Sequence, residues 1–232
     1  MNLVDLNVNS QNNKFLDKEP EFILEQSIKK LFKEKIVYVC SFGTESAIIL
    51  HLISKIKKEL PIIMINTHFL FEETLDYKNE LLNFFNLSNF KEIFPSVANL
   101  KKNDKSGDLW KSDIDKCCNL RKVLPLEKAL IPFKAWISGR KSYHMNKRQD
   151  LQVFEKINDK VVINPLFNVD RKYIENYFLT NNIPKHPLLK SGYLSIGCTN
   201  CTIKSNDIDN PRAGRLSNKI KTECGIHLEK KD

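Results

Sequence analysis

The chain has 232 residues, 41% of them hydrophobic, and a formal net charge of +9. This hydrophobic share supports a core and excludes global disorder, and the longest apolar run, LPIIMIN at 60–66, is much shorter than the roughly 18–20 residues of a membrane span. The lysines are scattered in pairs along expected helices, so the basic charge does not indicate a dedicated nucleic-acid surface.

The N-terminal half alternates between β-rich and helical patterns. Residues 1–20 are polar and without periodicity, and we expect a loose lead-in there. The expected elements that follow are a helix at 21–34, a buried strand at 36–42, a helix at 44–58 with Thr44 as its N-cap, a strand at 62–66, a helix at 71–85 and a strand at 90–94. This alternation predicts an α/β fold with a mainly parallel sheet.

The second half begins with a polar stretch at 99–108, for which we expect a loop or hinge. Beyond it we expect a helix in pieces over 115–130, interrupted near Pro125, strands at 135–139 and 160–166, and a helix at 171–182. From residue 183 onward, prolines, glycines and a CxxC motif replace periodic patterning. The sequence therefore predicts a loose lead-in over 1–20, an α/β domain over 21–205 and a C-terminal segment over 206–232.

The N-terminal residues, MNLVDLNVNSQNNK, contain no basic region followed by an apolar run. We therefore expect no signal peptide and a soluble cytoplasmic protein. The cytoplasm keeps thiols reduced, so the six cysteines indicate metal ligation or redox chemistry rather than a disulfide framework.

Four cysteines form two local pairs, Cys117–Cys118 and Cys198–Cys201, about 80 residues apart. Four thiolates in such pairs can close one metal centre. Zinc prefers ligands two to four residues apart, which suits the second pair better than the adjacent one, whereas an iron–sulfur cube offers separate corners to neighbouring residues. Buried, unreactive thiols are the alternative interpretation. Cys40 lies within an expected strand and is interpreted as a core residue.

The stretch CSFGTES at 40–46 falls at an expected strand-to-helix turn. Hydroxyl side chains beside a helix N-terminus favour an anion site, which makes Ser41, Thr44 and Ser46 candidates for phosphate contact. The stretch matches neither GxxxxGK[ST] nor GxGxxG, and an ordinary capped turn is the alternative.

Two basic clusters are candidates for binding an anionic substrate. NPRAGR at 210–215 places Arg212 and Arg215 three residues apart, and arginine recognises phosphate or sulfate with two parallel hydrogen bonds. GRKSYHMNKR at 139–148 follows a strand end, where α/β sheets bind ligands. Solvated surface is the alternative for both clusters.

Cys224 stands alone in the charged stretch KTECGIHLEKKD, close to His227. An accessible thiol near cations has a lowered pKa and acts as a nucleophile. The alternative is an incidental cysteine near the end of the chain.

Together, the stretches SFGTESA, LWKSDIDKCCNLRKVLPL, AWISGRK, GYLSIGCTNCT, DNPRAGR and ECGIH resemble the assimilatory sulfonucleotide reductases, specifically the iron–sulfur-containing adenylyl-sulfate (APS) reductases of bacteria. The resemblance runs from about residue 36 to residue 228. It implies a Rossmann-like adenine-nucleotide hydrolase (pyrophosphatase-loop) fold. It also implies thioredoxin-dependent reduction of APS to sulfite and AMP through a cysteine S-sulfonate, in sulfate assimilation and cysteine biosynthesis.

The resemblance also implies roles for individual residues. A [4Fe–4S] cluster would be held by Cys117, Cys118, Cys198 and Cys201. Lys122 would lie between cluster and substrate, the nucleotide and its phosphosulfate would be held by Arg140, Arg212, Arg215 and His227, and Cys224 would be the nucleophile. Since no resolving cysteine stands beside Cys224, thioredoxin or glutaredoxin would act as external reductant. We expect a homo-oligomer, and neither a nucleic-acid partner nor a membrane.

The chain departs from the family pattern in two places. Asn66-Thr67-His68 stands where the family often has Asp-Thr-Gly, and loss of that glycine leaves the local backbone open. The GRKSYH turn differs from the longer Arg-Arg-Asp-Gln version, which leaves the role of Lys141 open.

The sequence leaves three alternatives to APS reduction. The first is reduction of PAPS, whose cluster-free users lack both cysteine pairs. The second is an ATP pyrophosphatase, which needs a full SGGxDS loop, whereas Thr44 or Phe42 replaces the second glycine here. The third is a non-catalytic zinc- or nucleic-acid-binding module.

Overall fold

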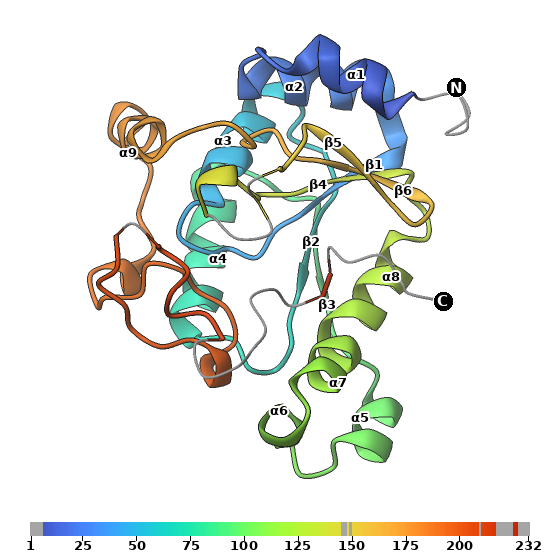
Figure 1. Ribbon diagram of the computed structural model, residues 1–232, viewed down its shortest axis with the longest axis vertical. Helices are drawn as coiled ribbons and strands as arrows, with labels where there is room; N and C mark the ends of the chain where they lie inside the picture. The colour runs from blue at the N-terminus through green and yellow to red at the C-terminus, as the bar shows by residue number, and fades with distance from the viewer. Residues whose placement is uncertain (1–6, 145–147, 149, 209, 217–224, 227–232) are drawn as a thin grey trace.

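The structure is a computed structural model that describes residues 7–144, 148, 150–208, 210–216 and 225–226 (Figure 1). Its described residues form a six-stranded sheet in the order β3-β2-β1-β4-β6-β5. The strands are β1 Ile36–Val39, β2 Ile62–Ile65, β3 Phe90–Ile93, β4 Ala135–Ile137, β5 Phe154–Ile157 and β6 Lys160–Ile163. All neighbouring strands pair in parallel except β5 and β6, which are antiparallel. The expected α/β fold with a mainly parallel sheet is confirmed, and β5 is an addition to it.

The helices are α1 Val8–Phe15, α2 Pro20–Gln26, α3 Ala47–Ile56, α4 Glu72–Phe84, α5 Val97–Asn103, α6 Leu109–Ser112, α7 Ile114–Cys118, α8 Leu124–Leu130 and α9 Arg171–Thr180. The expected helix in pieces over 115–130 is confirmed, because a π-helical turn over Asn119–Val123 separates α7 from α8. None of the helices in the described ranges is long and apolar enough to cross a membrane.

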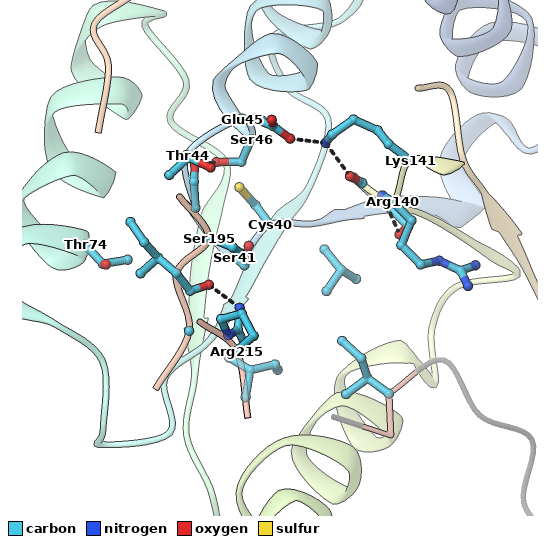
Figure 2. A pocket seen from close by; sticks show the side chains of 18 of the residues that line it. Cys40, Ser41, Thr44, Glu45, Ser46, Thr74, Arg140, Lys141, Ser195 and Arg215 are labelled. Atoms are coloured by element: carbon cyan, nitrogen blue, oxygen red, sulfur yellow. Dashed lines mark hydrogen bonds and ion pairs between the residues drawn. The ribbon is translucent and has the colours of Figure 1, made fainter. Parts of the chain in front are cut away.

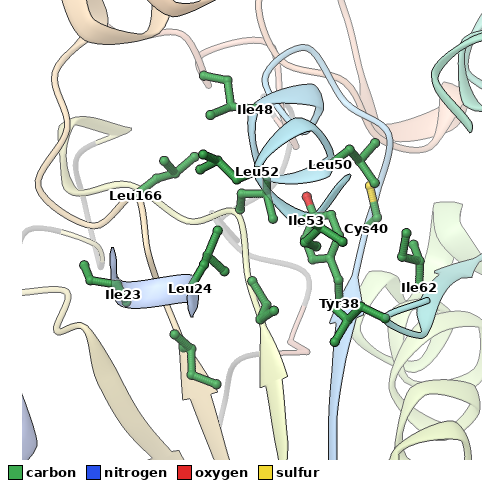
Figure 3. Close-up of a cluster of buried hydrophobic side chains, with 14 of the residues drawn as sticks. Ile23, Leu24, Tyr38, Cys40, Ile48, Leu50, Leu52, Ile53, Ile62 and Leu166 are labelled. Atoms are coloured by element: carbon green, nitrogen blue, oxygen red, sulfur yellow. The ribbon is translucent and has the colours of Figure 1, made fainter. Parts of the chain in front are cut away.

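Both faces of the sheet are buried, and the strand residues alternate between two clusters. Ile36 and Tyr38 of β1 point into the larger cluster, while Val37 packs into the smaller one. Helix α3 covers the larger side with fully buried aliphatic residues such as Leu52 (Figure 3), and α8 covers the other with Leu126 and Leu130. Each fully buried aliphatic side chain contributes about 1.5–3 kcal/mol, so this double-sided core holds the strand ends rigidly in place.

The expectation of a loose lead-in over 1–20 is wrong for residues 8–15, which form α1. Asn12 is the reason, because its side chain pairs with the backbone of edge strand β5. Its amide donates to the carbonyl oxygen of Phe154 at 2.9 Å and its oxygen accepts from that residue's N–H at 2.8 Å. Phe15 is buried against the ring of Phe154. A polar side chain thus attaches this helix to β5. The spacing of apolar residues in the sequence does not indicate such an attachment.

Two further local expectations are corrected. The polar stretch at 99–108 is helical up to Asn103, because the Ser96 side chain caps α5. This helix has no buried residues, so polar side chains are tolerated along it. Thr44 is not the N-cap of α3, which begins at Ala47 after an additional turn. Instead, the Thr44 hydroxyl donates to the carbonyl oxygen of Leu194 at 3.3 Å.

The strand order creates a switch point between β1 and β4. From β1 the chain builds β2 and β3 on one side, and then returns to place β4 on the other side. The loops that follow β1 and β4 therefore diverge at the carboxyl ends of the strands, which is where open α/β sheets bind ligands.

Candidate active site

A cavity of about 220 Å³ opens at this switch point. It is lined by the residues that follow β1, by those that follow β4, and by parts of the C-terminal segment (Figure 2). The described substrate-binding candidates on its wall are Ser41, Thr44, Ser46, Lys122, Arg140, Arg212 and Arg215. The fold thus brings together side chains from distant parts of the sequence, from Ser41 to Arg215.

Two sequence candidates, Cys224 and His227, lie outside the described residues. Ile226, which stands between them in the sequence, lines the cavity and packs against the smaller core cluster. Ile226 was not among the candidate residues, and nothing in its residue type indicated a place in the site.

The loop after β1 is a tight turn held by its own hydrogen bonds. Phe42 is fully buried and adopts φ 49°, and its N–H donates to the sulfur of Cys40 at 3.4 Å. The Ser46 hydroxyl donates to the carbonyl oxygen of Gly43 at 2.8 Å, and the Tyr38 hydroxyl donates to that of Ser46. Ser46 therefore shapes this loop as well as lining the cavity. Cys40 is a core thiol as expected, and burial raises its pKa to about 12.

Arg215 lies against the backbone at Ile196 and Gly197, just before the CxxC motif. Its Nη1 donates to the carbonyl oxygen of Ile196 at 2.6 Å, while its buried Nε has no hydrogen-bond partner among the described atoms. A Cβ added to Gly197 would stand 2.1 Å from Nη2 of this guanidinium, so only glycine permits the approach. The need for glycine at position 197 is thus steric.

A short antiparallel pairing joins the arginine loop to the CxxC motif. Thr202 and Arg215 form an antiparallel bridge, and the N–H of Leu216 donates to the carbonyl oxygen of Cys201 at 2.9 Å. Gly214 is needed here, because an added Cβ would lie 2.2 Å from the carbonyl oxygen of Ile203. The two motifs are therefore one structural unit.

Arg140 lines the cavity but its guanidinium contacts the carboxylate of Glu155, on the unexpected strand β5. Asn164 donates to the same carboxylate oxygen at 2.8 Å. Figure 2 shows Arg140 and Arg215 apart, at separate parts of the cavity. Glu155 was not among the candidates, since no strand was expected at its position.

A second, smaller cavity of about 20 Å³ is lined by Cys117, Cys118, Cys198 and Cys201 together. Lys122 and Arg215 line both cavities. These two cations therefore stand between the cysteines and the larger cavity.

The cysteine loops are held by the segment that follows β2. The N–H of Thr199 donates to the carbonyl oxygen of Phe69 at 2.7 Å, and the Thr67 hydroxyl lies 3.3 Å from the sulfur of Cys198. His68 occupies the left-handed region at φ 66°, and its N–H donates to the Asn66 side chain at 2.9 Å. His68 stands where the family often has glycine, and its backbone keeps the left-handed conformation that glycine favours.

A buried ion pair supports the same cavity. Nε and Nη2 of Arg121 donate to one carboxylate oxygen of Asp104, at 3.0 and 2.5 Å. Nη1 donates to the carbonyl oxygen of Thr67 at 2.9 Å, and the guanidinium lies 4.1 Å from the centre of the Phe69 ring. Neither charged residue was among the candidates taken from the sequence. Arg121 follows Cys117 by one helical turn, which could have identified it, but Asp104 lies in a polar stretch without a signal.

Burial raises the pKa of the Cys117 thiol to about 11, although the nearby Arg121 guanidinium opposes the shift. The thiol is thus protonated at neutral pH, and a bound metal would have to displace its proton. Among the described residues, no group of three or more His, Cys, Asp or Glu is arranged to hold a single metal ion.

Comparison with known proteins identifies the family. Residues 35–204 match the phosphoadenosine phosphosulfate reductase domain. The chain belongs to this family. Membership in the phosphoadenosine phosphosulfate reductase family makes the protein an oxidoreductase that acts on sulfur compounds.

A family relative from Mesorhizobium japonicum, named adenosine 5'-phosphosulfate reductase, is 41% identical over 210 residues that cover 90% of this chain and 83% of the relative. Among solved structures, the phosphoadenylyl-sulfate (PAPS) reductase of Candida auris in a phosphate complex is similar with a TM-score of 0.72 and 28% identity, over 84% of this chain and 96% of that one. Yeast FAD synthetase, at 13% identity, shares the fold alone with a TM-score of 0.58 over 87% of this chain and 70% of that one. These neighbours confirm the expected Rossmann-like adenine-nucleotide fold.

Proposed function

We propose that the protein reduces APS to sulfite and AMP with electrons from an external dithiol protein such as thioredoxin or glutaredoxin. This reaction belongs to sulfate assimilation and leads towards cysteine. The observation that carries the proposal is the cavity at the switch point, in which a hydroxyl-lined loop faces cations that also border a four-cysteine cavity. The name of the Mesorhizobium japonicum relative supports APS as the substrate.

The charges of the cavity suit the phosphosulfate group, which carries two negative charges. Lys122, Arg212 and Arg215 line it from two separate segments. Attack by a thiolate brings a further negative charge towards this dianion. Preorganised cations would offset the repulsion most strongly in the transition state.

Cys224 is proposed as the nucleophile. Its thiolate attacks the sulfur of the sulfate group and forms an S–S bond, while the S–O bond to the phosphate breaks. AMP leaves with that electron pair, and a cysteine S-sulfonate remains. Ile226 lines the cavity two residues further along the chain, and consecutive Cα atoms are 3.8 Å apart, which supports a role for Cys224 at this cavity.

The reductant completes the reaction. One thiolate of its dithiol attacks the sulfur of Cys224, and sulfite leaves with the electrons of the S–S bond. The second thiol of the reductant then releases Cys224 and forms a disulfide. Both electrons therefore come from the dithiol.

The four cysteines are proposed to hold a [4Fe–4S] cluster. The fit rests on the donor set, since four thiols line one small cavity beside the cations Arg121 and Lys122. When bound, the cluster would supply a fixed charge and a covalent link between α7 and the CxxC turn. Lys122 would then contact the substrate from the cluster side.

PAPS is the second candidate substrate, and the likeness to the Candida auris PAPS reductase favours it. The two nucleotides differ by a 3'-phosphate, so steady-state kcat/KM values for both with one thioredoxin decide between them. A clear preference for PAPS would overturn the APS assignment.

The decisive experiment is mass spectrometry of the reduced protein after mixing with APS alone. We expect a sulfonate adduct on Cys224, with one AMP released per adduct. An adduct on another cysteine, or no adduct from active protein, would refute the mechanism.

The control variant Cys224→Ser should retain iron and acid-labile sulfide but make no sulfite. Cys198→Ser should lose the iron. Protein that holds zinc and no sulfide would instead support a zinc module. The cytoplasmic location and the homo-oligomeric state stay predictions, and the second can be measured by analytical ultracentrifugation.

A further inference from the structure

Lys141 is a buried lysine at the cavity whose role the sequence left open. Its side chain is 3% exposed, and its ammonium group lies 2.9 Å from a carboxylate oxygen of Glu45. The same ammonium donates to the carbonyl oxygen of Gly139 at 2.8 Å (Figure 2). Glu45 belongs to the loop after β1 and Lys141 to the loop after β4, so this ion pair joins the two loops across the switch point.

Glu45 is an unexpected residue on the wall of an anion site. It lines the same cavity as Ser41 and Arg215, and its carboxylate repels any anion that enters. A second contact fixes the carboxylate in place, because the Tyr143 hydroxyl donates to its other oxygen. Glu45 and Tyr143 also line a neighbouring cavity of about 310 Å³, so the carboxylate forms part of the wall between the two spaces.

We propose that Lys141 is a positioning residue that neutralises the charge of Glu45 and locks the β1 and β4 loops together, so that the cavity accepts an anionic nucleotide. Lys141 is buried and the Glu45 side chain is 19% exposed, so solvent screens their charges less than it would on an open surface. The inference rests on the proposed function only for the choice of nucleotide.

A charge role and a purely structural role predict different results for neutral and anionic ligands. If the pair only holds the loops, its loss weakens binding of every nucleoside ligand alike. If Lys141 neutralises Glu45, its loss weakens binding in proportion to ligand charge. Adenosine is neutral and AMP carries a charge of about −1.5 to −2 at pH 7, so the two form a matched pair.

The test is isothermal titration of the full chain with adenosine and with AMP. In Lys141→Met, we expect the Kd for AMP to rise roughly tenfold or more, because the Glu45 carboxylate loses the cation that lies 2.9 Å from it and repels the anionic nucleotide more strongly. The Kd for adenosine should stay within about twofold. Equal losses for both ligands would overturn the inference.

The double variant Glu45→Gln with Lys141→Met removes both charges and serves as the rescue. We expect its Kd for AMP to return to within a few-fold of the wild-type value, and failure of this recovery would also overturn the inference. If Lys141→Met does not fold, the double variant and Glu45→Gln alone carry the test, and Glu45→Gln should bind AMP at least as tightly as the wild type.

Wild-type protein that binds no AMP would overturn the proposed function, and this inference with it. Wild-type protein that binds AMP, together with a variant that loses both ligands equally, would overturn this inference alone.

Discussion

The two walls of the candidate site are built in different ways. The loop after β1 continues directly from a strand that is buried on both faces, and hydrogen bonds within the loop shape it. The CxxC loop and the arginine loop, within residues 196–216, follow no strand of the sheet. They are held by contacts to distant residues, such as Phe69, and by the close approach at Gly197. The first wall depends on the core and the second on a few specific contacts. Core substitutions should therefore lower stability, and substitutions at those contacts should lower activity.

The largest expected effect concerns the ion pair behind the cysteine cavity. Asp104→Asn leaves the Arg121 guanidinium buried without its counter-ion, which should cost about 3–5 kcal/mol of unfolding free energy. Iron content per chain should fall as well, because Arg121 borders the cysteines. Denaturant unfolding and iron analysis measure the two effects. Asp108→Asn, an exposed neighbour in the same loop, is the control and should be near neutral.

On the sheet side, Leu52→Ala removes a fully buried side chain from α3 and should cost about 2–5 kcal/mol in stability. The kcat/KM of the protein that remains folded should stay close to the wild-type value. A large loss of kcat/KM without loss of stability would show that the core does not hold the loop after β1 in place.

At the second wall, Gly197→Ala should lower kcat/KM and leave stability almost unchanged. The added Cβ would overlap the Arg215 guanidinium and displace it. Since small displacements of positioning groups cost about a hundredfold in rate, we expect a similar loss of kcat/KM with little change in melting temperature. The control is Gly107→Ala, where no atom lies within 4 Å of the added Cβ. That variant should lose some stability through its positive φ and keep its activity.

The attachment of the chain around His186 to α4 should depend on pH. This histidine is 1% exposed, its Nε2 lies 3.1 Å from the Thr74 hydroxyl on α4, and burial lowers its pKa to about 4. Its unfolded pKa is about 6.5, so the unfolded chain binds the proton more readily. This contribution to stability is complete above pH 6.5 and falls as the pH drops towards 4.

At pH 5, the loss relative to pH 7 should be roughly 2 kcal/mol from this residue. Urea unfolding at both pH values, compared with His186→Asn, isolates the contribution. An unchanged pH dependence in the variant would contradict the assignment.

The smallest effect is expected at the segment after β2, which contacts the CxxC loop. His68→Gly should raise stability by about 0.5–1 kcal/mol, because glycine adopts φ 66° without steric cost. Thermal unfolding measures the change. Asn86→Gly, at φ 52°, should gain less since asparagine tolerates this region. A loss of stability in His68→Gly would show that the stacking of His68 on Phe94 matters more than the backbone.

The elements of the sheet that were predicted from sequence are those whose pattern is local. Strands β1, β2 and β4 are continuous apolar runs, and α3 follows β1 with the expected periodicity. Elements that depend on a partner were missed. Helix α1 is polar and docks through Asn12, and β5 has its partner only in the hairpin with β6.

The same division applies to the site. Residue type and spacing in the sequence identified the two cysteine pairs, the hydroxyl residues after β1 and the arginines of NPRAGR as candidates. That these residues share two adjoining cavities, bridged by Lys122 and Arg215, depends on the crossing of the chain at the switch point. The partners of the charged residues, Glu155, Asp104 and Glu45, were decided only by the tertiary structure. A buried charge needs a counter-ion close in space, and sequence separation sets no limit on where that counter-ion comes from.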